Sequence, residues 1–252
     1  IFESDSGYLA CGDVGKGRLP EPDEIEDKIK EVFEEDKFLE GKHILVTAGP
    51  TSEAIDPVRM ITNHSTGKMG YALARAARNM GAHVTLVSGT KQIEDIRDVE
   101  MVHVTSAKDM AEAVLSRQND MDCMILAAAV ADYTPVSVAD NKIHKSEGEM
   151  SIPLKRTQDI LKTLGENKKD GQVLIGFSME TENMVERTKE KLVKKNCDYI
   201  VANNLKEKGA GFGTDTNIVT LISKDHEEEF GILSKYDTAV KILKTCLKEK
   251  KA

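Results

Sequence analysis

The segment after the first buried strand carries residues that could bind a phosphate. An apolar run ends in a Gly-Pro pair, a long polar stretch follows, and Ser65, Thr66, Gly67 and Lys68 stand where a helix is predicted to begin. A helix N-terminus offers unpaired N–H groups and a partial positive charge, so it readily receives an anion. The same residues also fit a purely structural role, in which Ser65 caps the helix and Gly67 allows a backbone conformation that other residues avoid. The sequence predicts a phosphate site and leaves that alternative open.

A second group of polar residues follows the apolar run 122–130. Asp132 comes directly after this run, where a parallel sheet usually meets its ligand, and Lys142 and Lys145 lie in the loop-like stretch beyond it. Two lysines on a loop could close over a triphosphate. The alternative is an ordinary solvated basic loop.

A third basic group lies near the C-terminal third of the chain. Lys191 and Lys195 are four residues apart on one predicted helical face, where like charges repel each other. A bound polyanion would relieve that repulsion, although a solvated face would also accommodate it. The glycine-rich stretch 209–217 is either a closing element or a permissive turn.

The elements that must position these residues alternate in type along the chain. Apolar runs on both faces, each followed by a helical pattern, are typical of a parallel sheet covered by helices on both sides. We therefore expect an α/β fold, a doubly wound Rossmann-like and mostly parallel sheet, closed by a C-terminal hairpin at 217–223 and 227–233. Strands are predicted at 43–48, 83–88, 99–105, 122–130, 172–177 and 198–202, and helices at 68–80, 107–118, 157–167, 182–196 and 235–250.

The N-terminal residues have a different character. Residues 1–22 are rich in Gly and Pro and are predicted to form a loop, and residues 23–36 show the apolar spacing of a short amphipathic helix. The expected organisation is an appendage at 1–22, a helical linker at 23–42 and the main domain at 43–252. The first residue is Ile1, which suggests a piece of something longer.

Composition narrows the classes of function. The net charge of −8 disfavours general nucleic-acid binding, and no apolar run is long enough to cross a bilayer. The four cysteines are scattered without a CxxC pair, which favours reduced thiols and a cytoplasmic location. The scattered histidines give no transition-metal motif, so no protein metal ligands are predicted. The dinucleotide fingerprint GxGxxG is also absent after the first strand.

Seven segments, in order, resemble phosphopantothenoylcysteine synthetase, a ligase of coenzyme A biosynthesis. They are ILVTAGPT, ITNHSTGKMG, AAAVADYTP, NKIHK, QDIL, GFSMET and VANN, spread over residues 43–250. The resemblance implies that CTP activates 4′-phosphopantothenate as an acyl-cytidylate, which L-cysteine then attacks, with Mg²⁺ sharing the phosphate charge. It also implies a homodimer.

The resemblance assigns roles to individual residues. Asn63 would donate to the oxyanion that develops when cysteine attacks, and Lys142 would hold the triphosphate. Substrate and phosphate contacts fall to Ser65, Thr66, Gly67, Lys68, Ala127 and Ala128, and nucleotide contacts to Asp132, Lys142, Gln158, Asp159, Ile160, Leu161, Phe177, Lys191 and Lys195.

Residues 8–22 resemble the final substrate-clamp segment of phosphopantothenoylcysteine decarboxylase. In that family a cysteine like Cys11 is the proton donor of a flavin-dependent reaction. The resemblance implies that a fused decarboxylase domain carries FMN and is missing here, which leaves Cys11 idle. The resemblance to a fused synthetase also implies a preference for CTP over ATP.

Two other classes of function remain open at this point. One is an NADP-dependent reductase on the same fold, with Lys91 meeting a 2′-phosphate. The other is a non-catalytic regulator that binds a phosphorylated metabolite, for which Asn63, Asp132 and Lys142 form only a binding shell.

Overall fold

The computed structural model describes residues 5–8, 12–20, 22, 24–26, 29, 37–145, 149–180, 184–204 and 214–248. The chain divides into two units, Ile1–Lys37 and Phe38–Ala252. In the first unit, β1 (Asp5–Tyr8) pairs antiparallel with β2 (Val14–Arg18), so the prediction of a loop at 1–22 is wrong for these residues. Gly12, just before β2, has a positive φ of 91°, a backbone conformation that glycine adopts without steric cost. Cys11 and most of the predicted helix 23–36 lie outside the described residues.

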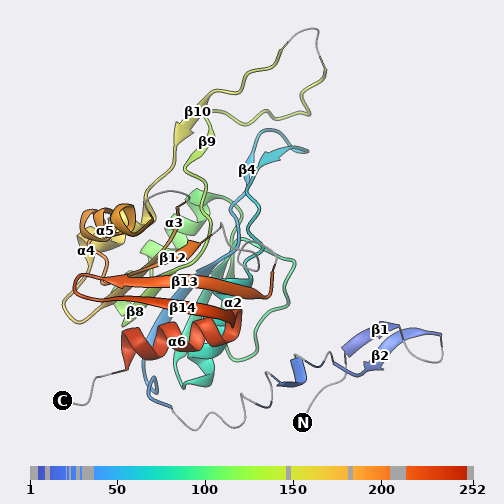
Figure 1. Ribbon diagram of the computed structural model, residues 1–252. Coiled ribbons are helices and arrows are strands. Elements are labelled where there is room, and N and C mark those ends of the chain that lie inside the picture. The colour runs from blue at the N-terminus through green and yellow to red at the C-terminus, as the bar shows by residue number, and fades with distance from the viewer. Residues whose placement is uncertain are drawn as a thin grey trace. The chain divides into compact units, whose positions relative to one another are not determined.

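The second unit is built on an eight-stranded sheet with the order β14-β13-β12-β11-β8-β3-β6-β7 (Figure 1). The pairings from β12 to β7 are parallel, and β13 and β14 form an antiparallel hairpin at one edge. The strands are β3 (His43–Ala48), β6 (His83–Ser88), β7 (Glu100–His103), β8 (Cys123–Leu126), β11 (Val173–Glu180), β12 (Tyr199–Asn204), β13 (Thr216–Ser223) and β14 (Glu227–Ser234).

Helices cover both faces of this sheet, and each face has its own hydrophobic core. Alternate residues of β3 point to opposite sides, so that Ile44 and Val46 join one core while Leu45 joins the other. The first core lies under α2 (Lys68–Asn79) and α6 (Lys235–Leu247). The second lies under α3 (Ala107–Leu115), α4 (Ile160–Asn167) and α5 (Met184–Lys194), and a short 3-10 turn η1 (Gln118–Asp120) follows α3. The predicted doubly wound α/β fold with a C-terminal hairpin is confirmed.

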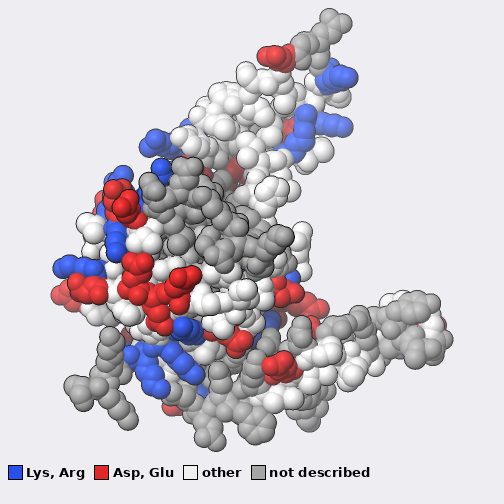
Figure 2. Space-filling view, in the orientation of Figure 1, with Lys and Arg blue, Asp and Glu red and all other residues white. Residues whose placement is uncertain are grey.

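Two small hairpins extend from the sheet, and the sequence patterns did not predict them. β4 (Glu53–Ala54) pairs with β5 (Met60–Ile61), and β9 (Tyr133–Pro135) pairs with β10 (Leu154–Arg156). Together they form the projecting arm at the top of Figure 1. Much of its surface is uncharged in Figure 2, and its exposed apolar side chains include Val58, Met60, Val136, Val138 and Leu154.

Close backbone contacts hold the loop after β3 against the loop after β6. A Cβ at Gly89 would lie 2.2 Å from the carbonyl oxygen of Pro50, and a Cβ at Gly67 would lie 2.8 Å from Cγ2 of Thr90. At Gly89 two backbones come too close for any side chain, and Gly67 also has a φ of 85°, which favours glycine. The start of α2 is therefore fixed relative to the ends of two neighbouring strands.

The close contact at Gly89 predicts that a methyl group added at this position lowers the stability of the fold. We expect Gly89→Ala to lose about 1–3 kcal/mol of unfolding free energy in urea, because the methyl must displace the backbone at Pro50. Gly231→Ala is the matched control, since a Cβ there meets nothing within 4 Å. Equal stability of the two variants would contradict the contact.

Cys197, which follows the end of α5, is buried, and burial raises the pKa of its thiol from 9.0 to about 12. The folded chain therefore holds this proton more tightly than the unfolded chain does. Its contribution to stability is complete below pH 9 and is lost as the pH rises toward 12.

This shift predicts a pH dependence that one substitution should reduce. Between pH 9 and 11 the unfolding free energy of the wild type should fall more steeply than that of Cys197→Ala, by up to about 1.4 kcal/mol per pH unit. Urea unfolding at a series of pH values measures the two slopes. Parallel curves would show that Cys197 does not titrate in this way.

Candidate functional site

The ends of β3 and β8 bring two loops together at the C-terminal edge of the sheet. The hydroxyl Oγ1 of Thr47 accepts a hydrogen bond from the N–H of Ala128 at 3.1 Å, and Oγ1 of Thr51 accepts one from the N–H of Ala131 at 3.0 Å. Both threonines are buried. Ala127 and Ala128, predicted to contact substrate, thus lie beside the loop that leads to α2. Sequence patterns did not single out the two threonines, although both belong to the quoted motif ILVTAGPT.

Asn63 links the same two loops. Its Nδ2 donates to the carbonyl oxygen of Ala129 at 2.7 Å, and its Oδ1 accepts from the N–H of Ser65 at 3.0 Å. The side chain is half-buried. An amide nitrogen carries two hydrogens, so one remains available to a ligand. Asn63 therefore fixes the turn that precedes α2 and still presents a donor.

The N-terminus of α2 differs from the starts of α3, α4 and α6. Its N-cap is Gly67 in the left-handed region, with φ 85°, and no side chain caps it. By contrast, Ser106 caps α3, Asp159 caps α4 and Ser234 caps α6. The alternative of Ser65 as a plain N-cap is therefore wrong, and the first N–H groups of α2 have no side-chain cap.

Lys68 begins α2 and forms an ion pair with Asp215, with Nζ 2.6 Å from Oδ1. The hydrogen bond from Lys68 holds the pKa of Asp215 below its usual range. This pair joins the start of α2 to the residue just before β13, so the lysine predicted to meet a phosphate is accompanied by a carboxylate.

A buried carboxylate in the arm ties the loop of Lys142 in place. Asp56 accepts hydrogen bonds from the guanidinium of Arg59 and from the N–H of Ile143. The bond from Arg59 holds the pKa of Asp56 well below its usual range. Sequence reasoning missed both residues, although an acid and an arginine three positions apart were a readable signal.

Three of the residues predicted to contact a nucleotide, Asp159, Lys191 and Lys195, lie close to one another. Lys195 forms an ion pair with Asp159, and Lys191 donates to Oγ of Ser178 at 3.4 Å. Burial acts to raise the pKa of Asp159, but Lys195 and the N–H of Lys162 outweigh it, so the pKa is lowered. Both lysines are thus engaged by protein groups.

The remaining predicted nucleotide contacts are dispersed. Ile160 is buried in the second core, where Leu161 also packs, and Phe177 packs against the first core. Gln158 is exposed and donates to Oγ1 of Thr163 at 3.4 Å. The exposed side chains of Asp132 and Lys142 have no hydrogen-bond or ion-pair partner among the described residues.

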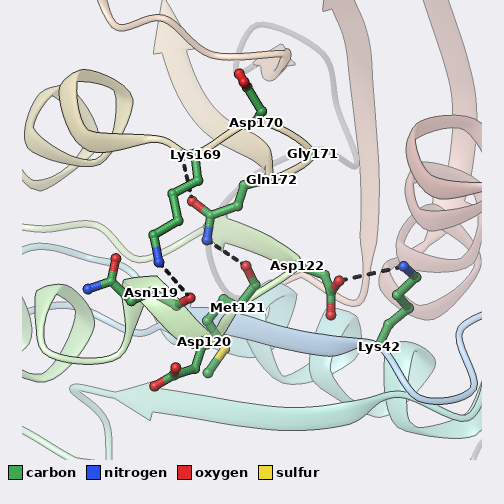
Figure 3. A pocket seen from close by; sticks show the side chains of 9 residues that line it. All are labelled: Lys42, Asn119, Asp120, Met121, Asp122, Lys169, Asp170, Gly171 and Gln172. Atoms are coloured by element: carbon green, nitrogen blue, oxygen red, sulfur yellow. Dashed lines mark hydrogen bonds and ion pairs between the residues drawn. The ribbon is translucent and has the colours of Figure 1, made fainter.

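A polar pocket lies at the opposite edge of the sheet, where strands begin (Figure 3). Nε2 of Gln172 donates to the carbonyl oxygens of Gln118 and Met121, at 2.7 and 2.6 Å. Asp122 pairs with Lys42 and accepts from the N–H of His43. These polar groups satisfy one another, so we interpret the pocket as a structural junction.

Comparison with known proteins identifies one matching family and several similar proteins. Residues 39–249 match the family "DNA/pantothenate metabolism flavoprotein C-terminal domain". The chain is 53% identical to the coenzyme A biosynthesis bifunctional protein CoaBC of Bacillus subtilis, over 96% of this chain and 61% of that protein. It is 44% identical to a cysteine/cysteine sulfinic acid decarboxylase of an unknown prokaryotic organism, over 98% of this chain and 70% of that protein. The crystal structure of the C-terminal domain of a CoaBC protein is similar, with a TM-score of 0.70 and 50% identity over 82% of this chain and 96% of that one.

These names contradict the expectation of a CTP-dependent ligase. The matched family is described as a flavoprotein family, and the decarboxylase relative is named for a different reaction. The synthetase resemblance, the ligase activity and the substrates CTP, 4′-phosphopantothenate and L-cysteine are corrected accordingly. In the structure Lys195 and Asp159, both expected to contact the nucleotide, form an ion pair with each other.

The cofactor and partner expectations change with the reaction. FMN was expected only in a missing neighbouring domain, but the flavoprotein description applies to the matched residues 39–249. Mg²⁺ and CTP were expected because the chain was predicted to be a ligase, and the expected binding partners followed from the same prediction. Among the described residues no group of three or more acidic, histidine or cysteine side chains is placed to hold a metal ion.

None of the described helices is long and apolar enough to span a membrane.

The family match spans most of the chain, and the Bacillus subtilis relative exceeds half identity over nearly all of it. The chain spans about three fifths of the length of that relative. This chain belongs to the DNA/pantothenate metabolism flavoprotein C-terminal domain family.

Proposed function

We propose that residues 38–252 bind a phosphopantothenoylcysteine-type compound, a phosphate ester with an acyl-cysteine end, within a flavoprotein of coenzyme A biosynthesis. The observation that carries the proposal is the uncapped N-terminus of α2, which stands beside the hydroxyls of Ser65 and Thr66 at the C-terminal edge of the sheet. Such an edge is the usual ligand site of a doubly wound fold. A phosphate there would accept hydrogen bonds from the N–H groups that no side chain caps.

The rest of the compound would follow the edge formed by β3 and β8. The spare Nδ2 hydrogen of Asn63 and the half-buried Ala127 and Ala128 lie along this edge. An amide donor suits the carbonyl groups of a pantothenoyl chain, and small alanine side chains leave space for it. The exposed Lys142 would attract the carboxylate of the cysteine end.

The reaction belongs in this proposal to the whole protein, of which the chain covers a part. The names of the relatives favour decarboxylase-type flavoprotein chemistry in coenzyme A biosynthesis. The cysteine carboxylate is the group that such a reaction would remove. A cytoplasmic location is part of the same proposal, and it is supported by the free cysteines Cys123, Cys197 and Cys246.

The flavin that the family name implies can be compared with the described residues. Ser65, Thr66 and the first turn of α2 fit the phosphate of FMN as well as they fit any phosphate monoester. A bound flavin would supply redox chemistry. The described residues would hold its phosphate or that of the substrate, and Asn63 would stand at the turn just before that phosphate.

The proposal predicts a phosphate-dependent affinity that one acidic substitution should reduce. By titration calorimetry the protein should bind phosphopantothenoylcysteine at least about tenfold more tightly than the dephosphorylated compound, since a charge-assisted hydrogen bond contributes about 1.5–3 kcal/mol. Ser65→Asp should weaken binding by a similar factor because its carboxylate competes for the same N–H groups. A negative charge at a helix N-terminus is itself stabilising, so the variant should still fold well.

Ser65→Ala is the matched control, because it removes the hydroxyl without adding charge. It should lose less affinity than Ser65→Asp. The proposal fails if the two forms of the compound bind equally, or if Ser65→Asp leaves the affinity unchanged. FMN added as a competitor shows whether flavin and substrate share the phosphate position.

A further inference from the structure

Asp56 is a buried carboxylate with an unusually complete set of hydrogen bonds. Its side chain is inaccessible to solvent, and its two oxygens accept from the N–H groups of Val58, Arg59 and Ile143, at 2.8, 2.8 and 3.1 Å. Nε of Arg59 also donates to Oδ2 at 2.9 Å. The first two N–H groups belong to its own turn, but Ile143 lies 87 residues away. Asp56 therefore joins two segments that are distant in sequence.

Arg59 completes the link from the other side. Its Nη2 donates to the carbonyl oxygen of Ile143 at 2.7 Å, so the acid and the arginine together occupy both backbone groups of that residue. The N–H of Ala139 donates to the carbonyl oxygen of Ile55 at 3.0 Å. The segment 139–143 is thus held at both ends by the segment 55–59.

The held segment contains Lys142, whose side chain is exposed and has no partner among the described residues. The holding segment leads within a few residues to Asn63 and Ser65, which shape the start of α2. The two ends of the predicted ligand site are therefore connected through the Asp56–Arg59 pair. The Asp56 carboxylate is inaccessible to solvent, and such a group is costly to bury unless its oxygens are hydrogen-bonded, as they are here.

We propose that Asp56 and Arg59 are positioning residues that fix Lys142 relative to the Asn63–Ser65 turn, so that Lys142 meets a second anionic group of a ligand whose phosphate lies at α2. The second group is a carboxylate in the compound proposed above, and this part rests on the proposed function. The clamp itself, the hydrogen-bonded link from Asp56 and Arg59 to Ile143, does not depend on ligand identity.

The first test measures the clamp in the free protein by hydrogen–deuterium exchange. Asp56→Asn and Arg59→Lys should each raise exchange in residues 139–145 by at least about tenfold, because local opening becomes about 1.4 kcal/mol easier. Arg59→Lys keeps the charge but loses the fork that reaches both Asp56 and Ile143. Two variants are used so that a folding defect in one does not decide the result.

Glu53→Gln is the matched control. Glu53 is also a buried carboxylate of this arm, but it accepts from the N–H of Ala107 at the start of α3. It should leave exchange in residues 139–145 at the wild-type level. Unchanged exchange in both clamp variants, or an equal increase in the control, overturns the clamp.

The second test measures phosphopantothenoylcysteine affinity in a double-mutant cycle of Asp56→Asn and Lys142→Ala. If Asp56 acts by positioning Lys142, each single variant loses affinity and the double variant is no weaker than Lys142→Ala alone. Additive losses, or full affinity in Lys142→Ala, overturn the positioning role. Wild-type protein that binds no phosphopantothenoylcysteine overturns the proposed function and the ligand role of Lys142, whereas the exchange experiment decides the clamp separately.

Discussion

The parallel pairing of β3 with β8 is the interaction on which the candidate site depends. Residues 44–47 pair with residues 123–126, and this register places the hydroxyl of Thr47 under the N–H of Ala128. Just beyond, Pro50 pairs with Ala129 as an isolated bridge, and Asn63 reaches the same alanine. A shift by one residue would turn the side chains of either strand to the other face of the sheet. The polar contacts at the site therefore require a register that is set by buried apolar residues.

The sequence predicted the sheet well because most of its strands are largely buried and are bounded by polar residues or glycine. It predicted helix ends less well. The helix expected at 157–167 begins at Ile160, since Asp159 caps it, and the helix expected at 107–118 ends at Leu115 before a short 3-10 turn. Hydrophobic periodicity does not record where a side chain caps a helix. The hairpins β4–β5 and β9–β10 were missed because two or three residues are too few to show an alternation.

The candidate site was predictable where its residues follow one another along the chain. Ser65, Thr66 and Gly67 could be placed at a helix start from their order alone. The contact between Asp56 and Ile143 could not, because it joins positions far apart in sequence and depends on how two arms meet. Ile160 fitted a motif but lies in the core, and the ligase assignment transferred a reaction from short motifs that are equally compatible with other chemistry on the same fold.

The strand order also determines when the site can form during synthesis. β6 follows β3 closely in the chain, so the pair β3–β6 can assemble while the ribosome is still producing α3. The other side of β3 must wait for β8, and Lys68 must wait for Asp215, which lies 147 residues further on. Until then an open strand edge is available to other chains. A nascent chain of this protein would therefore benefit from protection of β3 between the appearance of β6 and that of β8.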